Sequence, residues 1–126
     1  MVFKEFLFKG RKLDELKRMS IAELSLILPS DARRKIKRLT DAEKKLMDKI
    51  QNAKKPVKTH NRSMLILPFM VGKIISIHDG HQYQPVIITE EMIGRKFGEY
   101  ALTRRRVMHS APGIGATKSS SSLSVK

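Results

Sequence analysis

The stretch SMLILPFMVGKIISIHDGHQYQPVII, residues 63–88, decides the fold of this chain. Its apolar runs at residues 64–67 and 74–77 are short, and Pro68 and Gly72 separate them. Short apolar runs that are bounded by proline and glycine are typical of strands, whereas helices need longer periodic segments. We therefore expect a sheet in this part of the chain.

The dipeptide Asp79-Gly80 predicts how two strands of that sheet are joined. Both residue types tolerate a positive φ, so the pair is typical of a two-residue type I′ turn between antiparallel strands. The hairpin would link residues 73–78 to a returning strand that ends at residues 86–88. Pro85 indicates an edge position or a bulge in the returning strand, because proline donates no backbone hydrogen bond.

Helix signals precede the sheet. The capping boxes Ser20-Ile21-Ala22-Glu23 and Thr40-Asp41-Ala42-Glu43 predict one short helix that ends before Pro29 and one longer helix that follows Thr40. Between these two helices, Ser30 or Asp31 can cap a third helix through Leu39. Its basic stretch, residues 33–38, disfavours this helix in isolation through self-repulsion.

The whole chain is expected to be an α+β protein: a small antiparallel sheet of about three strands, N-terminal helices, and a short helix after the hairpin that Thr89 can cap. Residues 54–58, KKPVK, predict a basic linker that proline breaks. The expected organisation is a helical basic N-terminal extension over residues 1–58, a core over residues 59–103 and a flexible basic C-terminal arm over residues 104–126.

Charge narrows the class of partner. The chain has 126 residues, with 26 Lys and Arg against 12 Asp and Glu, a formal net charge of +14 and a pI near 10.4. This excess is far larger than solubility requires and indicates a polyanionic partner, most often a nucleic acid. No apolar run reaches the length of a membrane span, so no membrane partner is expected, and the absence of cysteine is compatible with the cytoplasm.

The last residues, 100–126, carry five basic side chains and no acidic one. Their few bulky apolar residues are spread among glycine, proline and the serine run at residues 119–122. Ordering such a segment alone would cost more free energy than its burial returns. We therefore expect the arm to depend on a partner for its order.

Sites of small-molecule chemistry are not expected. Two histidines around the turn in His78-Asp79-Gly80-His81, without cysteine, make an incomplete metal site. The adjacent carboxylates of Glu90 and Glu91 are explained by the start of the short helix and not by catalysis. The sequence therefore predicts no metal, no cofactor, no small-molecule substrate and no enzyme activity.

A family resemblance rests on residues of the hairpin and on those that follow it. Asp79-Gly80-His81, Ile88, Ile93-Gly94, Phe97-Gly98-Glu99-Tyr100 and Thr103, at this spacing, resemble the signature of the ribosomal small-subunit protein nineteen family, called protein fifteen in eukaryotes. Residues 62–68 resemble the family's entry from strand to proline. The stretch PGIGAT, residues 112–117, and the helical N-terminal extension are similar to the archaeal and eukaryotic branch.

The resemblance implies a structural constituent of the small ribosomal subunit, located in the cytoplasm. It implies binding to the 3′ domain of small-subunit ribosomal RNA in the subunit head, beside small-subunit protein thirteen, with the C-terminal arm near tRNA and mRNA at the decoding site. The competing hypothesis is a free-standing basic protein that binds and compacts DNA, which would share the charge. Such a protein would follow DNA and not ribosomal subunits when a lysate is fractionated.

The candidate RNA-binding residues are basic side chains that the fold or the arm would present to phosphates. With few aromatic residues and no tryptophan, the chain is expected to recognise backbone geometry and not to offer stacking platforms. Basic runs are often only solvated faces, but the resemblance favours RNA contact. The candidates are Lys58, Arg62, Lys73, His81, Arg95, Lys96, Arg104, Arg105, Arg106, His109 and Lys118, with Arg33, Arg34 and Arg38 ranked second.

Overall fold

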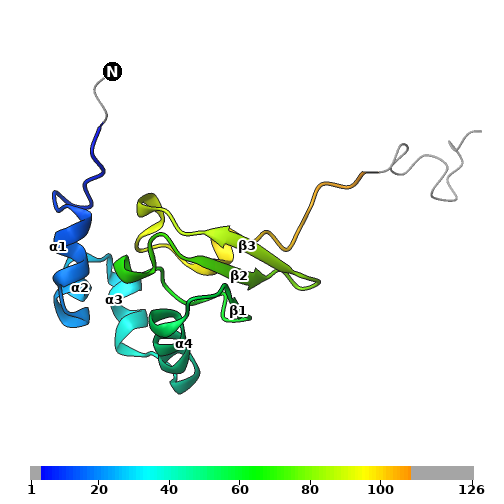
Figure 1. The fold of residues 1–126 in the computed structure, drawn as a ribbon, viewed down its shortest axis with the longest axis horizontal. Helices are drawn as coiled ribbons and strands as arrows, with labels where there is room; N and C mark the ends of the chain where they lie inside the picture. Colours follow the sequence, from blue (N-terminus) through cyan, green and yellow to red (C-terminus); the bar gives the residue numbers. More distant parts are fainter. Residues whose placement is uncertain (1–3, 109–126) are drawn as a thin grey trace, which may run out of the picture.

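The computed structural model describes residues 4–108, in which helices precede a small sheet (Figure 1). The helices are α1 (Leu13–Arg18), α2 (Ile21–Ile27), α3 (Ser30–Lys37) and α4 (Asp41–Asn52). The strands are β1 (Val57–Thr59), β2 (Ile74–His78) and β3 (Tyr83–Ile87), and the 3₁₀ turns are η1 (Pro68–Met70), η2 (Glu90–Met92) and η3 (Phe97–Glu99). The predicted α+β class and the expected number of about three strands are confirmed.

Both predicted capping boxes are present. The Ser20 hydroxyl accepts from the amide of Glu23 at 3.3 Å, and the Glu23 carboxylate accepts from the amide of Ser20 at 2.8 Å, which starts α2. Thr40 and Glu43 exchange the equivalent bonds at the start of α4. Each pair satisfies two amides that lack partners within the helix, so the local sequence alone sets these two starting points.

The start of α3 was predicted wrongly. Pro29 occupies the N-cap position and Ser30 is already helical, so neither Ser30 nor Asp31 caps the helix with its side chain. The helix also ends at Lys37, before the predicted Leu39. A fixed φ suits proline to the entry of a helix, and this backbone preference replaces the side-chain cap.

The sheet has the order β1-β2-β3 and is mixed, not purely antiparallel as expected. β2 and β3 pair antiparallel, whereas β1 pairs parallel to β2 with Val57 opposite Ile75 and Thr59 opposite Ile77. β1 begins within residues 54–58, which were predicted to be a linker. Pro85 lies on the edge strand β3, as predicted, where its missing amide leaves no gap between strands.

The connection between β2 and β3 is longer than the predicted two-residue turn. His78 pairs with Tyr83, so residues 79–82 form a four-residue loop. Gly80 has a φ of +99°, whereas Asp79 keeps a negative φ, which excludes the type I′ turn. The Asp79 carboxylate instead accepts from the amides of His81 at 2.9 Å and Gln82 at 2.8 Å. This side chain shapes the loop in place of a second left-handed residue.

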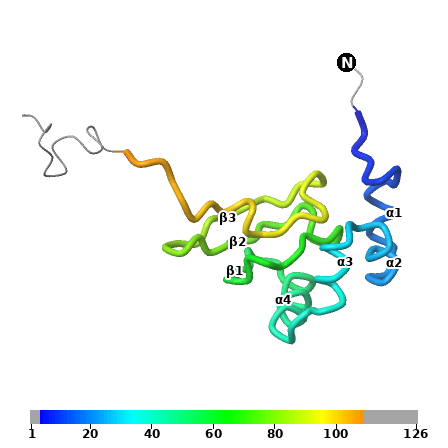
Figure 2. The backbone as a smooth tube through the Cα atoms, turned by 180° about the vertical axis from the view of Figure 1, so that it is seen from behind, coloured from blue at the N-terminus to red at the C-terminus, as the bar shows by residue number. Residues whose placement is uncertain are grey.

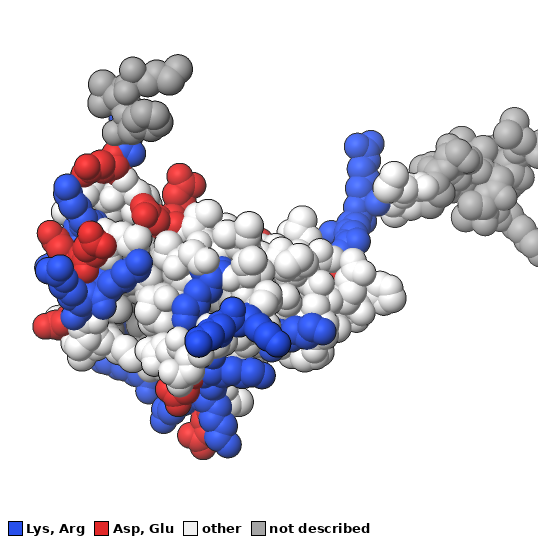
Figure 3. All heavy atoms as spheres, viewed as in Figure 1, with Lys and Arg blue, Asp and Glu red and all other residues white. Residues whose placement is uncertain are grey.

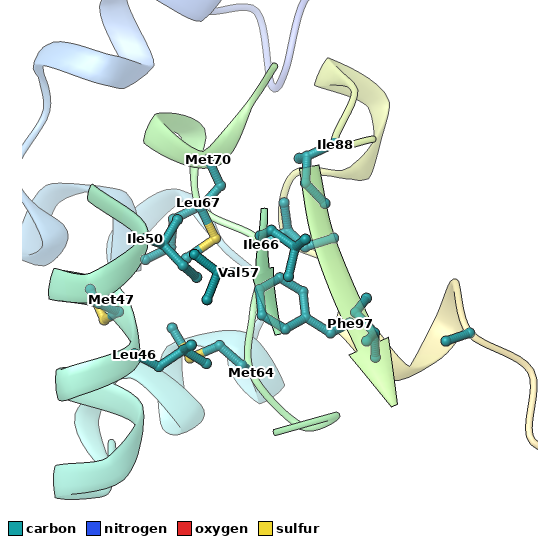
Figure 4. Packing of buried hydrophobic residues seen from close by; sticks show 13 residues of the cluster. Leu46, Met47, Ile50, Val57, Met64, Ile66, Leu67, Met70, Ile88 and Phe97 are labelled. Carbon is teal, nitrogen blue, oxygen red and sulfur yellow. The ribbon is translucent and has the colours of Figure 1, made fainter. Parts of the chain in front are cut away.

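Residues 64–67, predicted as a strand, form an extended segment whose only bridge among the described residues joins Leu65 to Lys96. All four residues are buried. Backbone hydrogen bonds still join this segment to residues 94–98, because Ile66 donates to the carbonyl of Arg95 and Phe97 donates to the carbonyl of Met64. The segment therefore passes through the core between α4 and the sheet (Figure 4).

The main core joins α4 to one face of the sheet and to the segments around it (Figure 4). Its fully buried members include Ile50, Ile66, Ile75, Ile77 and Phe97. Because Ile50 belongs to α4, residues before 59 contribute to the same core as the sheet. The predicted boundary between residues 58 and 59 falls inside β1.

The N-terminal helices pack on a second cluster, in which Leu16 and Leu24 meet Ile93 from beyond the sheet, with Phe6 and Phe8 partly buried around them. Seen from behind, residues 102–108 extend away at the end of the molecule opposite α1 and α2 (Figure 2). The arm therefore begins far from the N-terminal helices.

Candidate nucleic-acid interface

The charged ends of three candidate residues, Arg33, Arg62 and Lys73, point to backbone carbonyls of the protein itself. Arg33 lies on α3, and its guanidinium donates to the carbonyls of Ser25 at 3.0 Å and of Leu26 and Leu28 at 3.4 Å. These carbonyls belong to the last part of α2, where helix carbonyls lack partners and the helix dipole favours a cation. Arg33 therefore holds α2 against α3.

Arg62 connects three segments that are distant in the sequence. Its guanidinium donates to the carbonyl of His78 at 2.6 Å, to the carbonyl of Gly98 at 2.9 Å and to the carbonyl of Ala101. The planar fork of arginine can serve several acceptors at once, which the single ammonium of lysine cannot do in the same geometry. The end of β2 is thereby tied to the segment from which the arm leaves.

Lys73 has an equivalent internal role at α4. Its ammonium donates to the carbonyls of Ile50 and, at 3.0 Å, of Gln51, both in the last turn of that helix. Lys73 directly precedes β2, so this contact fixes the end of α4 beside the start of the strand. The position of its charge is explained by the fold alone.

Other candidates surround a shallow hollow of about 290 Å³ between α3 and the segment after η2. Asp31, Arg34 and Lys35 of α3 line it together with Arg38, which directly follows this helix, and Lys96 lines it from the other side. Lys96 lies 3.3 Å from the Asp31 carboxylate. Arg34 and Arg38 are exposed and form no ion pair with another described residue, so their charges remain available to a partner.

Lys35 is held at the edge of this hollow by the buried carboxylate of Glu43, at 2.5 Å. Burial alone would raise the pKa of Glu43, but hydrogen bonds from Lys35 and from the amide of Thr40 outweigh it and lower that pKa. Glu43 is therefore ionised at neutral pH, and it fixes α3 to the start of α4. The hollow has a rigid wall as a result.

A third group of candidates lies at the loop between β2 and β3 and at the root of the arm. The Arg105 guanidinium donates to the Asp79 carboxylate at 2.7 Å. The amides of Gln82 and His81, the Gln84 side chain and Arg105 together hold the pKa of Asp79 far below its usual range. Asp79 thus organises the loop and also receives the first part of the arm.

The remaining described candidates are exposed to solvent. Arg104 and Arg106 flank Arg105 and form no ion pair within residues 4–108, whereas Arg95 lies 3.7 Å from the Glu99 carboxylate. His81 is exposed in the loop, and Lys58 is exposed on β1. His109 and Lys118 lie outside the described residues.

The sequence did not predict the ring cluster, defined as His60, His78 and Tyr83. The His60 and His78 rings stack with centroids 4.2 Å apart, and the Tyr83 ring stands edge-on to both. Lys58 lies over the Tyr83 ring at 5.3 Å from its centroid. The register of the sheet brings these side chains together, so no pattern among residues close in the sequence predicts the cluster.

The charges are unevenly arranged over the face in Figure 3. Basic side chains gather over β1, below it over the helices, and at the root of the arm, whereas acidic side chains gather mainly around the helices. Within residues 4–108, no group of three or more His, Cys, Asp or Glu side chains could hold a metal ion. Among the described helices, none has the length and the apolar character needed to cross a bilayer.

Comparison with known proteins identifies the group to which this chain is related. The model of the family Ribosomal protein S19 matches residues 34–109, more than half of the chain. The chain belongs to the ribosomal protein S19 family. It is 47% identical to the small ribosomal subunit protein uS19 of Thermoplasma acidophilum and 44% identical to that of Thermoplasma volcanium, in each case over 124 residues that cover 98% of this chain and 82% of the relative.

Membership of the S19 family confirms the resemblance seen in the sequence and makes the chain a protein of the small subunit of the cytoplasmic ribosome, not an enzyme. The match to the S19 family begins at Arg34 and extends beyond the arginines at the root of the arm. It therefore covers α4, the sheet, the ring cluster and most of the hollow. Ribosomal RNA and ribosomal proteins are the partners of such a protein.

Proposed function

We propose that this chain binds the 3′ domain of small-subunit ribosomal RNA in the head of the subunit, beside small-subunit protein thirteen. The folded part docks through basic side chains whose positions the fold fixes, and the C-terminal arm approaches tRNA and mRNA at the decoding site. The family supports the choice of RNA over DNA, since the S19 family is a family of ribosomal proteins. The geometry supports contact through phosphates.

The hollow lined by Arg34, Arg38 and Lys96 is the observation on which this proposal rests most heavily. These side chains come from segments far apart in the sequence, yet they surround one depression of the surface. The exposed guanidinium groups of Arg34 and Arg38 can each offer two parallel hydrogen bonds to a phosphate. A rigid arrangement of this kind binds the shape of an RNA backbone and does not require base edges.

The root of the arm supplies the second contact of the proposal. Arg105 is tied to Asp79 of the loop, so its neighbours Arg104 and Arg106 start from a defined place on the domain. They would neutralise phosphates beside the loop. Residues 112–118, outside the described part of the chain, would then reach the decoding region.

Salt dependence tests the docking mechanism. The full chain would be titrated with a transcript of the 3′ domain of the small-subunit ribosomal RNA of its own organism, between 50 and 200 mM salt. If about six to ten phosphates are contacted, affinity should fall about a thousand-fold or more over this range. A nearly flat response would contradict the proposal.

A matched pair of double variants tests the hollow. Arg34→Ala with Arg38→Ala should weaken binding and lower the slope of log affinity against log salt by about two, because each lost phosphate contact changes it by about 0.9. Lys17→Ala with Arg18→Ala removes the same charge from exposed positions of α1, outside the region that the S19 model matches. Equal slopes for the two variants would reject the hollow as a docking site.

Crosslinking tests the placement. In intact small subunits, crosslinks from the folded part should map to 3′-domain RNA and to protein thirteen, and crosslinks from residues 112–118 should map near the decoding site. A chain that stops after Ala111 should still fold and enter subunits while its contacts near tRNA change. Failure of this truncated chain to assemble would overturn the proposed division between folded part and arm.

A further inference from the structure

One face of the sheet is turned away from the core, and its side chains reach solvent at both ends of the strands, whereas Ser76 in the middle is buried. Ile75 and Ile77 of β2 point into the core, so the alternate residues Ile74, Ser76 and His78 belong to the other face. Three cross-strand rows form there, because Ile74 pairs with Ile87, Ser76 with Pro85 and His78 with Tyr83. β1 adds Lys58 beside Ser76 and, one position after its last pair, His60 beside His78.

The row at the loop end of this face is the ring cluster. His60 and His78 stack at 4.2 Å with 28° between their planes, and the Tyr83 hydroxyl lies 2.7 Å from Nε2 of His60. The amide of Gly80 donates to Nδ1 of His78 at 3.0 Å, which fixes the inner ring of the stack. The three rings are therefore held in one arrangement by the strands and by hydrogen bonds.

The outer ring of the stack is accessible. His78 is half-buried and covers one face of the His60 ring, whereas His60 itself is exposed, which leaves its other face toward solvent. A flat π-system can extend such a stack by one layer. The purine and pyrimidine bases of RNA have this shape, and stacking accepts every base because each has a π-face.

The charges around the ring cluster favour RNA over a protein segment. Lys58 lies at 5.3 Å from the Tyr83 ring centroid, and none of the residues in the three rows carries a carboxylate. Asp79, the nearest acidic residue in sequence, is buried and neutralised by Arg105. The exposed apolar pair Ile74 and Ile87, which would suit a protein partner, lies at the other end of the strands.

We propose that the ring cluster is a stacking site for an unpaired nucleotide of ribosomal RNA, with the base on the outer face of His60 and an adjoining phosphate at Lys58. The inference rests on the proposed function and adds a mode of contact to it. A base inside a duplex is already stacked on both faces, so only a bulged, looped or terminal nucleotide can take this position. The folded part would thereby recognise one irregular feature of the RNA in addition to backbone shape.

Three full-length variants and the wild-type chain, titrated with the same 3′-domain transcript at one salt concentration, test the inference. His60→Ala should weaken binding by about 5- to 150-fold, as expected for the loss of one stacked base. His60→Phe keeps a flat ring and should bind within about twofold of the wild type. Ile87→Ala, at an exposed position on the same sheet face but at its other end, should bind like the wild type.

Salt titrations of two variants separate stacking from charge. His60→Ala should leave the salt slope unchanged, because stacking releases no counterions. Lys58→Gln should lower that slope by about 0.7 to 0.9, the value of one phosphate contact. Circular dichroism of each variant would verify that it is folded, and His60 lies outside the core clusters.

Each result has a defined meaning. If the wild type binds tightly and His60→Ala binds equally well, the stacking site is refuted while the proposed function stands. If His60→Phe loses as much affinity as His60→Ala, a hydrogen bond of the imidazole and not stacking makes the contact, and the inference is again wrong. If the wild type itself fails to bind the transcript, the proposed function fails first. A loss that appears only when ribosomal proteins are added would assign the face to a protein partner instead.

Discussion

Replacing Arg62 by lysine distinguishes a residue that holds the fold together from one that binds RNA. The positive charge is conserved, so long-range attraction to phosphates is unchanged. The guanidinium fork that serves the carbonyls of His78, Gly98 and Ala101 is lost, and a lysine ammonium at that place can reach one of them in good geometry. The variant therefore changes hydrogen bonding while it preserves charge.

The magnitude follows from the bonds that are lost. A hydrogen bond to a charged group contributes about 1.5 to 3 kcal/mol, and two of the three would disappear. Because Arg62 is only half-buried, water can hydrogen-bond to the freed carbonyls and offset part of the lost stabilisation. We expect Arg62→Lys to lower the free energy of unfolding by about 2 kcal/mol. For a domain of this size, that corresponds to a fall in Tm of about 8 to 16 °C.

Urea unfolding followed by circular dichroism measures this change, with Arg34→Lys as the matched control. Arg34 is exposed and hydrogen-bonds to no carbonyl among the described residues, so its replacement should change stability by less than about 0.5 kcal/mol. The dependence of unfolding on urea should have the same slope in all three proteins. If Arg62→Lys were as stable as the wild type, the fork would be incidental, and Arg62 would return to the set of phosphate ligands.

Three further predictions concern a glycine, a helix cap and a buried carboxylate. Gly94→Ala should destabilise the folded protein by about 1 to 2 kcal/mol in thermal melts, because φ is +82° at this position and a Cβ would lie 3.1 Å from Cδ2 of Leu28. An unchanged melting curve would contradict this and show that the turn relaxes around the new side chain. Thr40→Ala should cost about 1 kcal/mol by removing the cap on Glu43, and a loss below about 0.3 kcal/mol would contradict this. The folded pKa of Asp79 lies well below the ordinary 3.8, so its stabilisation is complete above about pH 5 and is lost as the pH falls toward the folded value. Asp79→Asn should flatten the dependence of unfolding free energy on pH between about pH 5 and pH 2.5, and parallel curves for the two proteins would reject the role of its charge.

Features encoded by neighbouring residues were predictable from the sequence. A capping box needs only four consecutive residues, and both boxes form as expected at Ser20 and Thr40. The edge position of Pro85 follows from its missing amide and is also present. Such signals depend on hydrogen bonds between residues that are close in the sequence, so the residue types alone are enough to predict them.

Features that depend on distant segments were not predictable in the same way. β1 contains only three residues, of which Val57 and Thr59 are buried, and its partner follows much later in the chain. The continuous apolar run at residues 64–67 has the composition of a central strand, but it is buried because it crosses the core, not because strands flank it. Periodicity cannot separate these two cases.

The candidate site shows the same limit. The sequence identified basic residues, but it could not show that the cationic ends of Arg33, Arg62 and Lys73 lie on carbonyls of the protein itself. His60 and His78 become neighbours only through the parallel register of β1 and β2. Composition indicates how much charge a chain carries, whereas the fold decides which charged side chains face a partner.

The parallel pairing of β1 also has a consequence for the order of events during synthesis. An antiparallel hairpin can form as soon as its turn has been made, but β1 must wait until residues 60–73 have been synthesised and have crossed back to bring β2 alongside it. Until then the apolar side of α4, including Leu46 and Ile50, has no sheet to cover it. If synthesis pauses while residues 60–73 are being made, the nascent chain exposes the apolar side of α4 and is prone to aggregate. A chaperone would be most needed at this stage.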